Sequence, residues 1–94
     1  MSITIGSHDF DDVAYDEGAD VLYLSVGEPE AAIGERTPEG HVVLLDEESH
    51  DVRGVTLVSP RYLRETEGKV TVTLPEGCFE IEAEELDLAM GAFA

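Results

Sequence analysis

The apolar residues of this chain come in short clusters, and Gly, Pro, Asp and Glu separate each cluster from the next. This spacing favours short strands joined by turns over long helices. Residues 2–5 are a further candidate for an edge strand. Strands are predicted in six other segments: 12–15, 21–26, 41–46, 52–59, 69–74 and 78–81.

The first two of these six strands are expected to form a hairpin. In the expected register Tyr15 opposes Val21 and Val13 opposes Tyr23, so these four side chains share one face. Gly18 is expected to supply the positive φ that the loop between the strands needs.

The third and fourth strands are expected to form a second hairpin with residues 47–51 as its loop. The third strand is apolar on both faces, with Val42 and Leu44 on one and Val43 and Leu45 on the other. A strand of an open antiparallel sheet normally has one face in water, so two apolar faces imply a cover on each side. The C-terminal helix and a second subunit are the two candidates.

The last third of the chain first alternates and then changes period. Residues 69–74 alternate apolar side chains with Thr, which predicts a half-exposed strand. From residue 83 the apolar spacing becomes helical, so we expect a short helix packed on the sheet. Its predicted apolar positions are Ala83, Leu86, Met90 and Phe93.

These patterns predict one α+β domain over residues 1–94, built mainly from an antiparallel sheet of five to six strands with a short C-terminal helix. A domain of 94 residues buries only about 60–65% of the surface that its unfolded chain exposes. Its core is therefore modest, and pairing into a homodimer is expected. Gly54, inside a predicted strand, indicates a bulge or a close backbone approach.

The charge of the chain is strongly negative. Its 22 acidic and 5 basic residues give a net charge of −17. Such a surface repels the phosphates of nucleic acids and attracts basic proteins. It also destabilises the compact state through self-repulsion, which salt relieves by screening, so adaptation to high salt is one interpretation of the acidity.

Cys78 is the single cysteine, which excludes an intramolecular disulfide and a multi-cysteine metal site. Acidic neighbours make its thiol less reactive, and we expect it to be a small, buried or half-buried apolar residue. Residues 1–10 lack the pattern of a secretory signal, and no run of 18 apolar residues occurs. A cytoplasmic location without membrane contact is expected.

The segment around the first hairpin loop is the main candidate for a binding site. Asp16 and Asp20 lie between Tyr15 and Tyr23, and tyrosines beside carboxylates can bind a polar substrate. The sequence nevertheless favours the interpretation that the carboxylates only form the turn, in water or bonded to loop amides, and the binding site is the alternative. Paired carboxylates work as general acid and base only when burial separates their pKa values, which an exposed loop does not do.

Residues 59–65 predict one helical turn, with Ser59 as its cap and Pro60 in its first turn. Arg61 and Arg64 are expected to pair with carboxylates; a small anion site is the alternative. No spacing of histidines, serines or glycines matches a metal, nucleophile or phosphate-binding motif, so no catalytic residue, metal or cofactor is predicted.

Two segments, "VAYDEGADVLYLSVG" and "TPEGHVVLLDEESHDVRGVTLVSPRYL", resemble a small bacterial and archaeal family catalogued as domain of unknown function 2283. The resemblance runs from about residue 10 to residue 74, and residues 75–94 extend beyond it. Its most specific part is the opening motif, Tyr15, Asp16, Asp20, Leu22 and Tyr23. It implies an antiparallel sheet in a small stand-alone chain, with some members encoded near toxin-like genes, and no assigned activity.

The sequence thus favours a non-enzymatic interaction module that self-associates and binds a basic protein, with toxin neutralisation as one version by analogy. Two alternatives stay open. One is a small ligand- or metal-dependent enzyme with a site at Tyr15, Asp16, Asp20 and Tyr23. The other is a salt-adapted structural protein without a specific partner.

Overall fold

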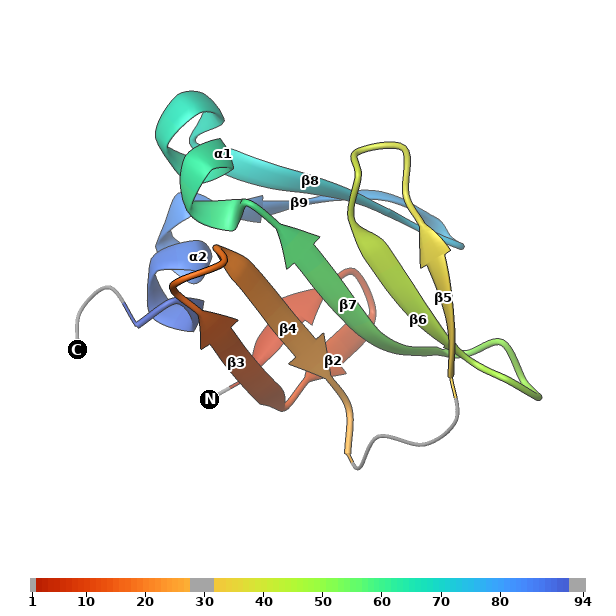
Figure 1. The fold of residues 1–94 in the computed structure, drawn as a ribbon. Helices are drawn as coiled ribbons and strands as arrows, with labels where there is room; N and C mark the ends of the chain where they lie inside the picture. The colour runs from red at the N-terminus through yellow and green to blue at the C-terminus, as the bar shows by residue number, and fades with distance from the viewer. Residues whose placement is uncertain (1, 28–31, 92–94) are drawn as a thin grey trace.

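The computed structural model describes residues 2–27 and 32–91. They form three antiparallel sheets and two helices (Figure 1). The five-stranded main sheet has the order β3-β4-β7-β6-β5, and two hairpins, β1-β2 and β8-β9, form the smaller sheets. The elements are β1 (Ile3–Ile5), β2 (His8–Phe10), β3 (Asp12–Asp16), β4 (Val21–Ser25), β5 (Ala32–Arg36), β6 (Val42–Asp46), β7 (Val52–Val58), α1 (Pro60–Glu67), β8 (Lys69–Leu74), β9 (Gly77–Glu82) and α2 (Ala83–Ala89).

The predicted α+β class, with antiparallel sheets and a C-terminal helix, is confirmed. All six predicted strands are present, and Ile3–Ile5 adds the candidate edge strand. Two further strands, His8–Phe10 and Ala32–Arg36, were not predicted. The second of these, β5, lies at the edge of the main sheet, where every side chain is exposed. Without a buried face, β5 has no apolar alternation to reveal it.

The main sheet has an inner face that the rest of the molecule covers. The two small hairpins and α2 lie on one side of the sheet (Figure 1). Between these layers lies one core, because Leu22 and Leu24 of β4 pack with Val70 and Val72 of β8 and with Leu86 of α2. All five side chains are almost completely buried. Figure 1 shows the opposite face of the sheet toward the viewer, with no helix over it.

The register of the first hairpin differs from the predicted one by one residue. Tyr15 pairs with Leu22, and Ala14 pairs with Tyr23. Since directly paired residues share a face, Tyr15 points to the inner face and Tyr23 to the other side. Asp16 therefore joins β3 and the turn is one residue shorter than expected, 17–20; within it Asp20 and not Gly18 has the positive φ, at 53°.

The outer face of the main sheet has no cover among residues 2–27 and 32–91. We define it by the side chains that alternate with the buried ones. Tyr23 and Val58 are 47% and 41% exposed there. Val42 and Leu44 lie on this face and are only half-buried, whereas Val43 and Leu45 are buried on the inner face. The apolar members of the outer face are Ala14, Val21, Tyr23, Val42, Leu44 and Val58.

Strand β6 is thus apolar on both faces as predicted, but among the described residues only its inner face has a cover. The inner face packs on the β8-β9 hairpin and the other elements of the core. The C-terminal helix, one of the two expected covers, lies on this inner side with Leu86 and Ala89 buried. Met90 packs against the core from just beyond the helix, and Phe93 lies outside the described residues.

Gly54 marks the bulge that the sequence indicated. The pairing of β6 with β7 shifts between Leu44 and Leu45, so that Arg53 is the extra residue. A Cβ on Gly54 would lie 2.7 Å from the carbonyl oxygen of Leu24 and 3.3 Å from Cδ1 of Leu44. Glycine therefore lets two strands and one outer-face side chain approach closely.

Cys78 is exposed, contrary to the expectation of a buried or half-buried residue. It pairs with Thr73 on the side of the β8-β9 hairpin that faces solvent, while the pair of Val72 and Phe79 points to the core. The reason is the alternation of β9, which begins at Gly77 and places every second side chain in water.

Candidate functional site

The carboxylate of Asp20 is the centre of the predicted tyrosine–aspartate site. The hydroxyl of Tyr15 donates to Asp20 Oδ1 at 2.7 Å. The amides of Arg61 and Tyr62 donate to Oδ1 and Oδ2 at 3.1 and 3.3 Å. The carbonyl oxygen of Asp20 also accepts the Ser59 amide at 2.8 Å. The carboxylate and the carbonyl oxygen of Asp20 thus accept all four of these hydrogen bonds from groups of the same chain.

Asp20 acts as the N-terminal cap of α1, although it lies about 40 residues away in the chain. Pro60 occupies the first turn as predicted, but Ser59 has a left-handed backbone and makes no side-chain cap bond. The first amides of a helix need an acceptor from outside it. A carboxylate at this end also interacts favourably with the helix dipole.

The protonation states of Asp20 and Tyr15 follow from their contacts. Burial alone would raise the pKa of Asp20, but the hydrogen bonds from Tyr15 and from the amides of Arg61 and Tyr62 lower it below its ordinary value. Burial and donation to Asp20 raise the pKa of Tyr15 to about 12. At neutral pH the carboxylate is charged and the phenol is neutral, so neither group is poised to exchange a proton.

The four residues of the predicted site do not meet. Asp16 accepts the Ala19 amide at 3.2 Å within its own turn. Tyr23 lies on the outer face, across the sheet from Tyr15. Of the four, only Tyr15 and Asp20 are hydrogen-bonded to each other. The carboxylates are therefore bonded to amides, as the turn interpretation expects, and they leave no shared cavity for a substrate.

Arg61 and Arg64 both pair with carboxylates. Arg64 forms a two-bond pair with Asp87 at 2.9 and 2.8 Å, which ties α1 to α2. Arg61 lies 3.6 Å from Glu17 and stacks over the Tyr15 ring, with its guanidinium carbon 5.6 Å from the ring centroid. Since a carboxylate neutralises each guanidinium, the arrangement does not favour an anion site.

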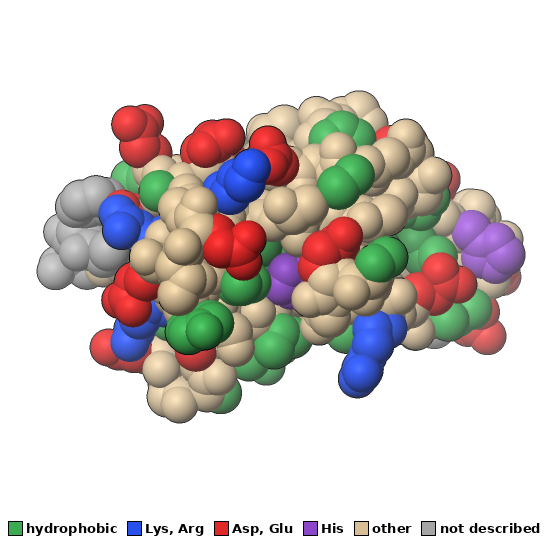
Figure 2. All heavy atoms as spheres, turned by 90° about the horizontal axis from the view of Figure 1, so that it is seen from above, with side chains coloured by type: hydrophobic (Ala, Val, Ile, Leu, Met, Phe, Trp, Pro, Cys, Tyr) green, Lys and Arg blue, Asp and Glu red, His purple; other side chains and the backbone are tan. Residues whose placement is uncertain are grey.

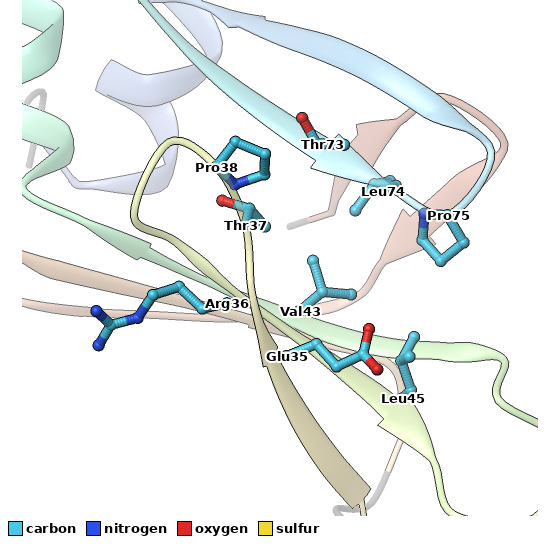
Figure 3. Close-up of a pocket in the computed structure, with 9 residues that line it drawn as sticks. All are labelled: Glu35, Arg36, Thr37, Pro38, Val43, Leu45, Thr73, Leu74 and Pro75. Atoms are coloured by element: carbon cyan, nitrogen blue, oxygen red, sulfur yellow. The ribbon is translucent and has the colours of Figure 1, made fainter.

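A cleft of about 250 Å³ opens on the inner side of the sheet edge, beside β5 (Figure 3). Val43, Leu45, Leu74 and Pro75 supply its apolar lining. Figure 3 shows the Glu35 side chain turned toward Leu45, whereas Arg36 extends from β5 to the opposite side. An apolar cleft with one carboxylate can accept the aliphatic stem and charged head of a basic side chain.

His41 is a buried titratable residue that the sequence did not single out. It is 1% exposed, and its Nδ1 accepts the Val58 amide at 3.0 Å. The proton of the neutral ring then sits on Nε2, which has no partner among the described residues. Burial lowers the pKa of His41, partly opposed by the charge of Glu39. A ring that carries its proton on Nε2 cannot ligate a metal through that atom.

Acidic side chains are spread over the molecule and do not gather at one site. Figure 2 shows them scattered over the side that carries α1 and the β8-β9 hairpin, with few basic groups among them. Lys69 pairs with Glu80 on this hairpin. No three His, Cys, Asp or Glu side chains come together as metal ligands in the described part of the chain. None of its helices is long and apolar enough to cross a membrane.

No protein-family model, curated protein or solved structure matches the chain. The resemblance to the domain of unknown function 2283 therefore stays a prediction, and the functional argument depends on the geometry of this molecule.

Proposed function

We propose that the protein is a non-enzymatic interaction module that self-associates through the outer face of its main sheet. One observation carries this proposal: a sheet face with exposed Tyr23 and Val58 has no cover from residues 2–27 and 32–91. Val42 and Leu44 extend the same apolar surface. Contiguous exposed apolar surface is typical of protein–protein contact sites.

The arrangement of the carboxylates supports this function over the enzymatic alternative. An enzyme of the kind considered needs a pocket with a carboxylate whose pKa is raised. The hydrogen bonds around Asp20 lower its pKa, and they come from a helix end and a half-buried tyrosine. The tyrosine–aspartate motif thus has a structural explanation.

Light scattering of the purified chain at micromolar concentration tests the proposal. We expect a dimer, and we expect Tyr23→Glu to dissociate it because a charge would be buried in the contact. Tyr62→Glu is the matched control, since Tyr62 is 62% exposed but lies on α1. A monomeric wild type, or equal effects of the two substitutions, would contradict self-association through this face.

A basic protein is the second candidate partner, and the cleft beside β5 supports it. The net charge of −17 favours the encounter, and Glu35 lies beside the apolar lining. A short peptide of alternating Lys and Leu is the probe for titration calorimetry. We expect Glu35→Lys to weaken binding more than Glu65→Lys, a control on α1; equal weakening would argue against the cleft.

A further inference from the structure

We infer that two copies pair outer face to outer face about a two-fold axis that runs along β7, so that Arg36 of each copy lies between Asp12 and Asp16 of the other. This geometry rests on the proposed self-association and adds to it the orientation of the two sheets and the charged contacts that set it.

The strand register places the required side chains in one row across the outer face. Ala14 pairs with Tyr23, Tyr23 with Thr56, Thr56 with Val42, and Val42 with Arg36. The row therefore runs from β3 at one edge of the sheet to β5 at the other, and its middle member is on β7. Arg36 is among the residues that line the inner cleft, and Figure 3 shows its side chain extending from β5 in the direction opposite to that of Glu35.

The symmetry of a face-to-face dimer then decides which edges meet. A two-fold axis parallel to the central strand exchanges the two edges, so β5 of one copy lies over β3 of the other. An axis perpendicular to the strands would instead place β3 over β3 and β5 over β5. Stacked sheets lie about 10 Å apart and stay within about 30° of alignment, so edge residues of one row remain near each other.

The first of these orientations brings opposite charges together. Asp12 and Asp16 flank Ala14 on the outer face, each about 7 Å from it along β3. The small side chain of Ala14 leaves room between them for a guanidinium. Among the described residues Arg36 is the one basic residue without an ion pair, since Arg53, Arg61, Arg64 and Lys69 all have one. The perpendicular axis would place Arg36 against Arg36 and aspartates against aspartates.

The apolar contacts fit the same axis. On β7, Thr56 and Gly54 lie on the axis and are small, which allows the two central strands to approach. Tyr23 on β4 then lies over Val42 of the second copy, because β4 and β6 flank β7 on opposite sides. An aromatic ring over a branched aliphatic side chain buries apolar area from both copies.

The outer face carries few of the acidic groups of a very acidic molecule. Its carboxylates, Asp12, Asp16 and Asp46, are nearly balanced by Arg36 and Arg53, and Arg53 already bonds Asp46 at 3.3 Å. The net charge of −17 therefore lies mostly elsewhere. Two copies consequently repel each other least when they meet through this face, and the Arg36 contact fixes their register.

A charge-exchange experiment tests the orientation. Arg36→Asp places like charges together in the inferred dimer, and so does the double variant Asp12→Arg with Asp16→Arg. We expect each variant alone to weaken the dimer at least about tenfold. An equimolar mixture should recover a heterodimer, because every edge contact then joins opposite charges. Sedimentation equilibrium in about 0.5 M KCl, where long-range repulsion is screened, measures the dissociation constants of the two variants and of their mixture.

Lys69→Asp is the matched control, because it makes the same change of charge on the β8-β9 hairpin. The dissociation constant of the Lys69→Asp dimer should stay near that of the wild type. If the wild type is a dimer that Tyr23→Glu dissociates but the mixture forms no heterodimer, the orientation is wrong and the self-association stands. If the wild type is monomeric, both the inferred orientation and the proposed self-association are wrong.

Discussion

At the scale of single residues, the aspartate that looks most like part of a site has a structural task. Asp20 joins the first hairpin to α1 by accepting from Tyr15 and from two helix amides. The sequence predicted that the carboxylates bond to nearby amides, and Asp16 does so within its turn. The amides that Asp20 accepts belong to a helix about 40 residues away, and no local pattern identifies such a partner.

Replacing Asp20 should therefore loosen α1. We expect Asp20→Ala to lower the free energy of unfolding by about 0.5–2 kcal/mol, the usual range for loss of a helix cap. Asp20→Asn should cost less, since Asn tolerates the positive φ and keeps one acceptor. Urea denaturation at fixed salt measures both. Glu47→Gln, which removes one charge from an exposed loop, should have little effect, and an Asp20→Ala value equal to it would contradict the cap.

His41 predicts how stability depends on pH. Burial lowers its pKa in the folded protein below the unfolded value of about 6.5. The unfolded chain then binds a proton first as pH falls, so the His41 contribution is complete above pH 6.5 and is lost toward lower pH. The expected slope between pH 7 and 5 is at most about 1.4 kcal/mol per pH unit.

Urea denaturation across this pH range tests the assignment through the slope and not through absolute stability. The slope should shrink in His41→Gln and persist in His50→Asn, which alters an exposed histidine at a positive φ. Equal slopes in both variants would contradict the role of His41.

At the scale of elements, the sequence predicted the strands whose side chains have a buried face. Lys69–Leu74 alternates and is half-exposed as expected, and β6 is apolar on both faces. Strand β5 has no buried side chain, so its pairing with β6 depends on backbone contacts that leave no pattern. The register of the first hairpin also escaped prediction, because Val21, the expected partner of Tyr15, and Leu22, its actual partner, are both acceptable by residue type alone.

The packing of β4 against β7 predicts the effect of a single methyl group. Gly54→Ala should destabilise the protein by about 1–3 kcal/mol, because the new Cβ would lie 2.7 Å from a backbone oxygen of β4 that cannot move freely. Gly18→Ala is the matched control, since its Cβ would meet nothing closer than 3.6 Å. Thermal denaturation of both variants measures the difference, which should vanish if the close approach is unimportant.

At the scale of the whole molecule, charge sets the conditions for stability and assembly. The net charge of −17 is carried by side chains distributed around the surface, as Figure 2 illustrates for one side. Composition alone predicted the net charge. It did not predict that the basic residues Arg36 and Arg53 lie on the outer face of the sheet. Arg36 reaches the outer face only because β5 joins the edge of the sheet.

Self-repulsion of this size predicts that salt stabilises the fold. We expect the melting temperature to rise with KCl and to level off near about 1 M, where the Debye length is about 3 Å. Thermal denaturation followed by circular dichroism from low to multimolar KCl measures the trend. A flat or falling melting temperature would show that repulsion between carboxylates does not limit stability and would remove the basis for salt adaptation.

Cys78 gives the molecule an experimental advantage. It is the single cysteine of the sequence, and it is exposed on β9, in the layer behind the main sheet. A maleimide fluorophore or nitroxide can therefore be attached without any substitution and without touching the face that we assign to dimerisation. Two such labels in one dimer would lie on its opposite sides, so their separation can be measured by spectroscopy in solution.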